Sequence, residues 1–286
     1  MNCAMVILNY RDSERAINLA INCAKFKSID KIVLVDNYSQ DGSFEKMKTL
    51  TNQKIAVLET YNNGGFAKGN NYGAEYLIRN YNPKYIFFAN TDTRFSEKNI
   101  MACMNALEKY SEIGLISTRM KGPDGKEQEG YFAIPTYREC IRDYFYLGRR
   151  YYAKNKHYPR SFYNKVERVE AVRGSFMFFR TEALQKAGMF DENTFMYCEE
   201  SIISMRLKRV GYTVGLCTDQ WYLHDHLESQ SNPSTVAMKR LYRSRFYMMV
   251  NYMKINTLKQ VYMKILARYS IIEWNIVLRL KKFVHR

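Results

Sequence analysis

The sequence predicts an α/β protein with a mostly parallel central sheet flanked by helices. Short apolar runs without polar interruption, typical of strands buried on both faces, alternate with stretches of helical period. Such alternation implies parallel strands joined by right-handed helical crossovers. The chain has 286 residues, 47% of them apolar, which suits one large domain or one domain with an appendage.

The elements follow one another in a regular order. Apolar runs predict strands at 4–8, 31–35, 55–59, 85–89 and 114–117. The segments between them predict helices at 13–26, 43–51, 67–79 and 97–110. Further strands are expected at 169–172, 176–179 and 213–216, with helices at 181–187 and 199–210.

Two segments depart from this alternation. Residues 131–168 are dense in Tyr, Phe and Arg, and we expect a partly helical excursion from the sheet. From residue 236 the chain is expected to be helical, with a second helix starting at a capping box over 257–260. We therefore predict a domain over 1–235 and a basic amphipathic helical extension over 236–286. Apolar residues recur at helical spacing in the extension: Leu258, Val261, Ile265, Tyr269 and Ile272.

The net charge of +16 is concentrated in the same two segments. Residues 236–286 hold twelve Lys and Arg against one acid, and residues 131–168 hold nine against three. Localised positive charge predicts an anionic partner, such as a bilayer surface, a nucleic acid or a phosphorylated substrate. A nucleic acid is not expected, because the chain contains no recognition motif.

Cysteine spacing and hydropathy predict a cytoplasmic protein. The six cysteines are isolated and show no zinc-type spacing, so we expect reduced thiols. The first residues lack the basic start of a signal peptide. The longest candidate for a spanning helix, 269–278, has ten residues and contains Glu273, whereas a bilayer needs ~20.

Polar residues follow the first four predicted strands. The carboxyl ends of parallel strands meet at one edge of a sheet, where ligands bind. Any one of these segments alone is typical of a turn, but four in register favour a site. The oxygen-rich triplet at 90–92 could hold a divalent cation, which in turn holds a diphosphate. The four segments are Asn9-Tyr10-Arg11, Asp36–Ser43, Asn62–Asn71 and Asn90-Thr91-Asp92.

The glycines within 64–69 do not belong to either of the two common nucleotide-binding motifs. A dinucleotide fingerprint would follow the first strand, and a P-loop would end in GK[ST], which is absent. We expect these glycines to allow a ligand to approach backbone N–H groups closely.

The order and spacing of these motifs resemble glycosyltransferase family 2, and most closely its rhamnosyl- and galactofuranosyltransferase-like branch. The resemblance covers roughly residues 4–230. Besides the strand ends, it rests on Gly174-Ser175-Phe176-Met177, Gly188-x-Phe190-Asp191-Glu192 and Phe195-Met196-Tyr197-x-Glu199-Glu200.

The resemblance implies a GT-A (Rossmann-like) fold, a nucleotide-diphosphate sugar donor (UDP- or dTDP-linked), a divalent Mn²⁺ or Mg²⁺ ion, and inversion at the anomeric carbon. It implies a glycan or lipid-linked acceptor in bacterial surface polysaccharide synthesis. By motif position, Asp36 would bind the nucleobase, and Asn9 and Tyr10 would line the nucleotide pocket. The remaining donor-site candidates are Asn37, Ser39, Gly65, Phe66, Asn70 and Asn90.

The resemblance also implies a metal site and a catalytic base. Asp92 would contact the metal, with His224 (alternatively His226) as a second ligand. Glu200 occupies the position of the base that takes a proton from the acceptor hydroxyl, and Glu199 is the alternative. Two acids in a first helical turn are also ordinary capping chemistry.

The sequence departs from the family pattern in two places. The metal triplet begins with Asn90 rather than Asp, and the pattern Glu-Asp-x-Asp is replaced by Glu199-Glu200-Ser201-Ile202. The competing hypothesis is therefore a non-catalytic or nucleic-acid-binding protein on a GT-A-like scaffold.

Basic residues interleaved with Tyr, Met, Ile and Trp in 236–286 suit an anionic membrane interface. This pattern predicts a peripheral protein on the inner face of the plasma membrane. Two alternatives stay open: a packing helix with a solvated basic face, and helices that pack in a homo-oligomer.

Overall fold

The computed structural model describes residues 1–148, 162–225 and 234–284, with side chains up to residue 279. The chain forms two compact units. The first comprises Met1–Ala133, Ser161–Glu192 and Glu199–Leu227. The second comprises Ile134–Arg160, Asn193–Cys198 and Glu228–Arg286. The predicted division into 1–235 and 236–286 stays a prediction.

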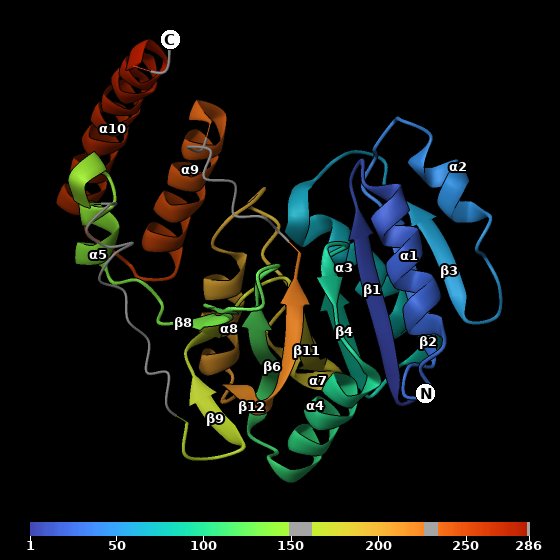
Figure 1. The fold of residues 1–286 in the computed structure, drawn as a ribbon. Coiled ribbons are helices and arrows are strands. Elements are labelled where there is room, and N and C mark those ends of the chain that lie inside the picture. The colour runs from blue at the N-terminus through green and yellow to red at the C-terminus, as the bar shows by residue number, and fades with distance from the viewer. Residues whose placement is uncertain (149–161, 226–233, 285–286) are drawn as a thin grey trace. The chain divides into compact units, whose positions relative to one another are not determined.

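The first unit is built on a ten-stranded sheet in the order β3-β2-β1-β4-β11-β6-β12-β5, with β7 on β6 and β9 on β12 (Figure 1). Strands β1, β2, β3 and β4 are mutually parallel, as are β6 and β12. The predicted mostly parallel α/β architecture is thus confirmed. The sheet strands are β1 Cys3–Asn9, β2 Lys31–Asp36, β3 Ile55–Glu59, β4 Tyr85–Ala89, β5 Thr93–Arg94, β6 Ile113–Lys121, β7 Glu127–Gln128, β9 Val166–Val169, β11 Phe176–Arg180 and β12 Thr213–His224.

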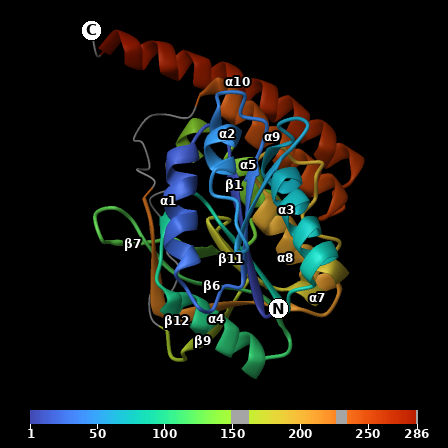
Figure 2. The ribbon, with the colours of Figure 1, turned by 90° about the vertical axis from the view of Figure 1, so that its right-hand side faces the viewer.

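Helices cover both faces of this sheet (Figure 2). On one face, α1 and α4 bury Leu19, Cys23, Ile100 and Leu107 against alternate residues of the central strands, and Met47 of α2 joins this core. The other face carries α3, α7 and α8. The helices of this unit are α1 Ser13–Ala24, α2 Ser43–Lys48, α3 Gly65–Tyr81, α4 Glu97–Lys109, α7 Thr181–Lys186 and α8 Glu199–Arg209.

Two glycines bring α3 close to the sheet. A Cβ built on Gly69 would lie 2.4 Å from Cδ1 of Leu8, and one built on Gly73 would lie 2.7 Å from Cγ1 of Val6. Gly69 therefore serves helix–sheet packing, which corrects our expectation that it would allow a ligand to approach the backbone. Because the two glycines are four residues apart, both lie on the face of α3 that meets the sheet.

Two strands differ from the sequence prediction in ways that matter for the site. Strand β11 runs antiparallel between β4 and β6, in register Phe176↔Ala89. Strand β12 was expected at 213–216 but continues to His224, with a register shift between Cys217 and Trp221. The continuation pairs Leu223 and His224 with β5. The six cysteines all lie within the described residues, and the structure joins none of them in a disulfide.

The second unit contains α5 (Tyr137–Arg142), α9 (Thr235–Asn251) and α10 (Thr257–Val284). The Arg245 guanidinium of α9 lies 3.0 Å from the Asp143 carboxylate, and both side chains are largely buried. Helix α10 begins at Thr257, but Asn256 caps it by accepting a hydrogen bond from Lys259 N at 3.0 Å. A short two-stranded ribbon, β8 (Tyr131–Phe132) with β10 (Ala171–Val172), belongs to the first unit.

Among the described residues, no helix combines the length and the hydropathy that crossing a bilayer would require.

We expect Gly73→Ala to lower the free energy of unfolding by about 1–3 kcal/mol. The added methyl group would press on Val6 and Val35, and overpacking then outweighs the ~1 kcal/mol by which alanine favours a helix. Urea unfolding monitored by circular dichroism would measure the change. Glu75→Ala, on the exposed side of α3, is the matched control. An increase in stability for Gly73→Ala would contradict this account of the packing.

Candidate active site

The ends of β1 and β2 are joined by a buried hydrogen-bond network. Asn9 Nδ2 donates to Asp36 Oδ1 at 2.7 Å. Ser39 donates to the same carboxylate twice, from Oγ to Oδ1 at 2.6 Å and from N to Oδ2 at 3.0 Å. Because Asn9, Asp36 and Ser39 are all essentially buried, this carboxylate holds the loop after β2 in place. Contact between Asp36 and a nucleobase stays a prediction.

The other donor-site candidates divide into framework and accessible residues. Asn37 Nδ2 donates to Asn63 Oδ1 and to Gly65 O, at 3.0 and 3.1 Å. Asn70 is buried and donates to Phe66 O one turn earlier in α3. Framework residues of this kind set the shape of the loops rather than present free polar atoms.

Three candidates are accessible at this edge. The Tyr10 side chain is 46% exposed, and Arg11 lies over its ring at 5.3 Å. Phe66 is half-buried and packs edge-on against Phe190, with ring centroids 5.7 Å apart. Asn90 is half-buried, and its backbone N donates to Ser175 O at 3.1 Å.

Asp92 and His224 meet although 131 residues separate them in the chain. The turn after β4 leads into β5, which pairs with the end of β12 so that Thr93 lies opposite His224. Asp225 N also donates to Asp92 O at 2.7 Å. As a result, Asp92 Oδ1 lies 3.4 Å from His224 Nε2, with side chains only 14% and 19% exposed. The structure thus brings together the two residues predicted to bind metal.

A carboxylate oxygen and an imidazole nitrogen at this separation suit a divalent cation of the Mn²⁺ type. The described part of the chain contains no group of three or more His, Cys, Asp or Glu side chains placed to hold a metal. The pair could therefore hold a metal only together with further ligands, such as oxygen atoms of a diphosphate or of water. The alternative ligand, His226, lies outside the described residues.

The two adjacent glutamates at the start of α8 have different environments. Glu199 is buried, and its Oε2 has no hydrogen-bond partner among the described residues. Burial, together with the charge of Glu200, raises the pKa of Glu199 to about 8. Glu200 is half-buried, and its Oε1 accepts a hydrogen bond from Gly174 N at 3.2 Å. Glu200 is therefore the more accessible carboxylate of the two.

Tyr222 is a further polar side chain near the end of β12, two residues before His224. It is fully buried, stacks on Phe176 at 5.0 Å and shares a hydrogen bond of 2.8 Å with Ser175 Oγ. Burial raises the pKa of the Tyr222 hydroxyl and outweighs the hydrogen bond to Ser175 and the charge of Arg173, which lower it, while the charges of Asp92 and Glu200 add to the increase. Tyr222 leaves no signal of its own in the sequence, because only its position in the extended β12 places it at this edge.

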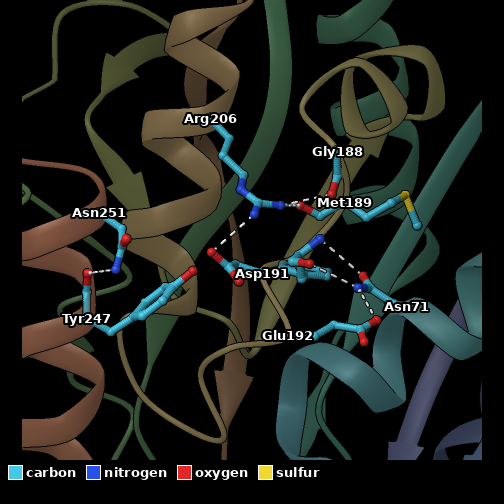
Figure 3. A network of polar contacts seen from close by, with 9 residues as sticks. Asn71, Gly188, Met189, Asp191, Glu192, Arg206, Tyr247 and Asn251 are labelled. Atoms are coloured by element: carbon cyan, nitrogen blue, oxygen red, sulfur yellow. Dashed lines mark hydrogen bonds and ion pairs between the residues drawn. The ribbon is translucent and has the colours of Figure 1, made fainter.

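A second polar network holds the loop before α8 (Figure 3). Arg206 pairs with the buried Asp191 at 3.1 Å and donates to the carbonyl oxygens of Gly188 and Met189. Asn71 of α3 exchanges hydrogen bonds with the Phe190 backbone at 3.0 and 3.1 Å. The Gly-x-Phe-Asp-Glu segment singled out in the sequence thus ties α3 to α8.

The chain is similar in sequence to known glycosyltransferases. The sequence model described as Glycosyl transferase family 2 matches residues 6–186. The chain is 22% identical over 244 residues to the low-salt glycan biosynthesis hexosyltransferase Agl10 of Haloferax volcanii, covering 85% of this chain and 74% of that protein.

Solved structures share the fold. S. aureus TarS 1-349 in complex with UDP-GlcNAc superposes with a TM-score of 0.56 at 14% identity, covering 92% of this chain and 70% of the other. GalNAc-T7 with UDP, GalNAc and Mn²⁺ gives a TM-score of 0.60 at 14% identity, covering 87% of this chain and 48% of the other. The expected GT-A fold is confirmed.

Glu199→Gln is expected to weaken the pH dependence of stability between pH 5 and 8. In the unfolded chain this carboxyl ionises near pH ~4.3, whereas in the folded protein its pKa is about 8. The folded state therefore binds a proton that the unfolded state has released, so the free energy of unfolding falls as pH rises. The slope reaches up to ~1.4 kcal/mol per pH unit. Urea unfolding of both proteins at pH 5, 6, 7 and 8 would measure it, and parallel curves would contradict the assignment.

Proposed function

Because this chain belongs to glycosyl transferase family 2, we propose that it is a metal-dependent, inverting glycosyltransferase using a nucleotide-diphosphate sugar. The observation that carries this proposal is the meeting of Asp92 Oδ1 and His224 Nε2 at 3.4 Å. Both residues were predicted from motif positions, and chain topology alone brings them together. UDP in the TarS and GalNAc-T7 structures supports a nucleotide-linked donor.

The donor is proposed to lie across the ends of β1, β2 and β4. Tyr10 and Phe66 offer accessible ring faces for the nucleoside, and the Asn9–Asp36–Ser39 network fixes the loops that hold it. The remaining donor-site candidates Asn37, Gly65, Asn70 and Asn90 shape this pocket. UDP- and dTDP-linked sugars, as in the rhamnosyl- and galactofuranosyltransferase-like branch, are the proposed donors.

Asp92 and His224 are proposed to hold Mn²⁺ or Mg²⁺. When bound, such an ion neutralises the charge that develops on the departing diphosphate. Mn²⁺ in the GalNAc-T7 structure supports this choice.

Glu200 is proposed as the catalytic base. Gly174 N fixes its Oε1, and the carboxylate takes the proton of the acceptor hydroxyl as the hydroxyl oxygen bonds to the anomeric carbon. The bond from that carbon to the diphosphate oxygen breaks, and the nucleoside diphosphate leaves with the electron pair. Attack opposite the leaving group inverts the anomeric centre. Glu199 is poorly suited to the role, because it is buried and stays protonated near neutral pH.

The acceptor is proposed to be a glycan or a lipid-linked glycan in bacterial surface polysaccharide synthesis. An enzyme with such an acceptor would act at the inner face of the plasma membrane. We propose residues 1–235 as the catalytic domain and residues 236–286 as its basic extension. Similarity to Agl10, a glycan biosynthesis hexosyltransferase, supports a role in glycan synthesis.

Asp92→Ala and His224→Ala are each expected to abolish the stabilisation of the protein by a donor with Mn²⁺. A bound donor raises the melting temperature only if its diphosphate is held, and these residues are proposed to hold the ion that binds it. Thermal-shift titrations with UDP- and dTDP-sugars, with and without Mn²⁺, would measure the effect. Asp225→Asn is the matched control, because Asp225 pairs with Arg94 at the surface. Equal stabilisation of all four proteins would contradict the metal site.

Glu200→Gln is expected to lower the transfer rate by ~10²–10⁴-fold, the usual contribution of a general base. Donor binding should persist, because Glu200 is proposed to act on the acceptor. Glu199→Gln should retain activity within about tenfold, since Glu199 is protonated near neutral pH. Nucleoside diphosphate release in the presence of acceptor measures the rate. A greater loss in Glu199→Gln than in Glu200→Gln would exchange the two roles.

A further inference from the structure

Helix α10 carries a stripe of large apolar side chains on its surface. At 3.6 residues per turn, they fall within about 100° of one another around the helix axis. Seven side chains, each 47–82% exposed among the described residues, make up this α10 stripe: Leu258, Val261, Tyr262, Ile265, Tyr269, Ile272 and Ile276.

The α10 stripe is distinct from the face by which α10 packs in its own unit. Met263, Leu266 and Trp274 are buried, and Ser270 Oγ lies 2.5 Å from the Tyr242 hydroxyl of α9. Among the described residues, helix α10 therefore has a second apolar face that stays largely exposed, although the ring of Tyr269 contacts that of Phe145, with centroids 6.0 Å apart. A contiguous exposed apolar face of this length is typical of an interaction surface.

The charges beside the stripe identify the partner. Lys264, Arg268 and Arg279 are exposed along one border of the stripe, and Lys259 is exposed on the other. The one acid in 236–286, Glu273, accepts a hydrogen bond from Tyr146 N at 2.8 Å. A second copy of this chain would bring two cationic segments together, whereas an anionic bilayer attracts such a segment.

We propose that the α10 stripe docks into the headgroup boundary of an anionic bilayer, with α10 lying along the surface. Apolar residues on one face and Lys and Arg beside them are the pattern of an interfacial helix. Tyr262 and Tyr269 suit the boundary, because their rings are apolar and their hydroxyls can stay hydrated. Docking would hold the enzyme beside a lipid-linked acceptor, and this role of α10 rests on the proposed function.

Vesicle flotation of the full chain tests the proposal. The protein should float with vesicles of phosphatidylcholine containing 30% phosphatidylglycerol and float less with phosphatidylcholine alone, and high salt should weaken the binding. The double variant Ile265→Glu, Ile272→Glu should reduce the bound fraction at least about tenfold. Its circular dichroism melt should match the parent, because both side chains are more than half exposed.

The matched control is Ile21→Glu with Met101→Glu. It adds the same two charges at exposed apolar positions of α1 and α4, so it should bind vesicles like the parent. Equal binding by the stripe variant, or no binding by the parent, would overturn the proposal. So would a parent dimer in analytical ultracentrifugation that the stripe variant converts to a monomer without losing vesicle binding.

A separate readout distinguishes failure of docking from failure of the proposed enzyme. Donor hydrolysis without vesicles should be the same in the parent and in the stripe variant. Hydrolysis by a parent that does not float would overturn the docking surface and leave the enzyme assignment standing. The opposite result is also informative. If the parent floats, the stripe variant does not, and the parent turns over no donor, the docking surface is supported and the enzyme assignment is contradicted.

Discussion

The antiparallel direction of β11 determines how the candidate site is assembled. Between two neighbours that run the other way, β11 presents its beginning at the edge where β4 ends. The two residues before it, Gly174 and Ser175, therefore lie at this edge, where they form hydrogen bonds with residues of α8, of the turn after β4 and of β12. Gly174 N binds Glu200, while Ser175 O accepts from Asn90 N and Ser175 Oγ meets Tyr222. A parallel strand would instead present its last residue, Arg180, at this edge.

The sequence predicted the strands and the edge they share, because a buried parallel strand leaves a local signal, an unbroken apolar run. The direction of β11 leaves no such signal, since 176–179 is as apolar as its parallel neighbours. The length of β12 was missed for a related reason. Asp219 and Gln220 interrupt its apolar pattern, and the strand resumes pairing only after a register shift. The contact between Asp92 and His224 depends on that resumed pairing.

Environment, more than residue type, separates the roles of the acidic side chains. Glu199 and Glu200 are neighbours on α8, so their side chains leave the helix about 100° apart, and only one of them is buried. Asp36 has a third kind of environment. Its carboxylate is nearly inaccessible and accepts hydrogen bonds from Asn9 and Ser39. Motif position identified Glu199, Glu200 and Asp36 as candidate site residues. It could not predict which would be protonated, which internally bonded and which accessible.

In helix α10, the periodicity of apolar residues does not reveal which face of the helix is buried. The apolar set recognised in the sequence, Leu258 to Ile272, has helical spacing, and such a set normally marks the buried face of a helix. In the structure this set is exposed, and the packed face consists of the less regular group Met263, Leu266, Ser270 and Trp274. Spacing alone cannot choose between two apolar faces of one helix. The face that packs is the one that carries Ser270, whose Oγ lies 2.5 Å from the Tyr242 hydroxyl of α9.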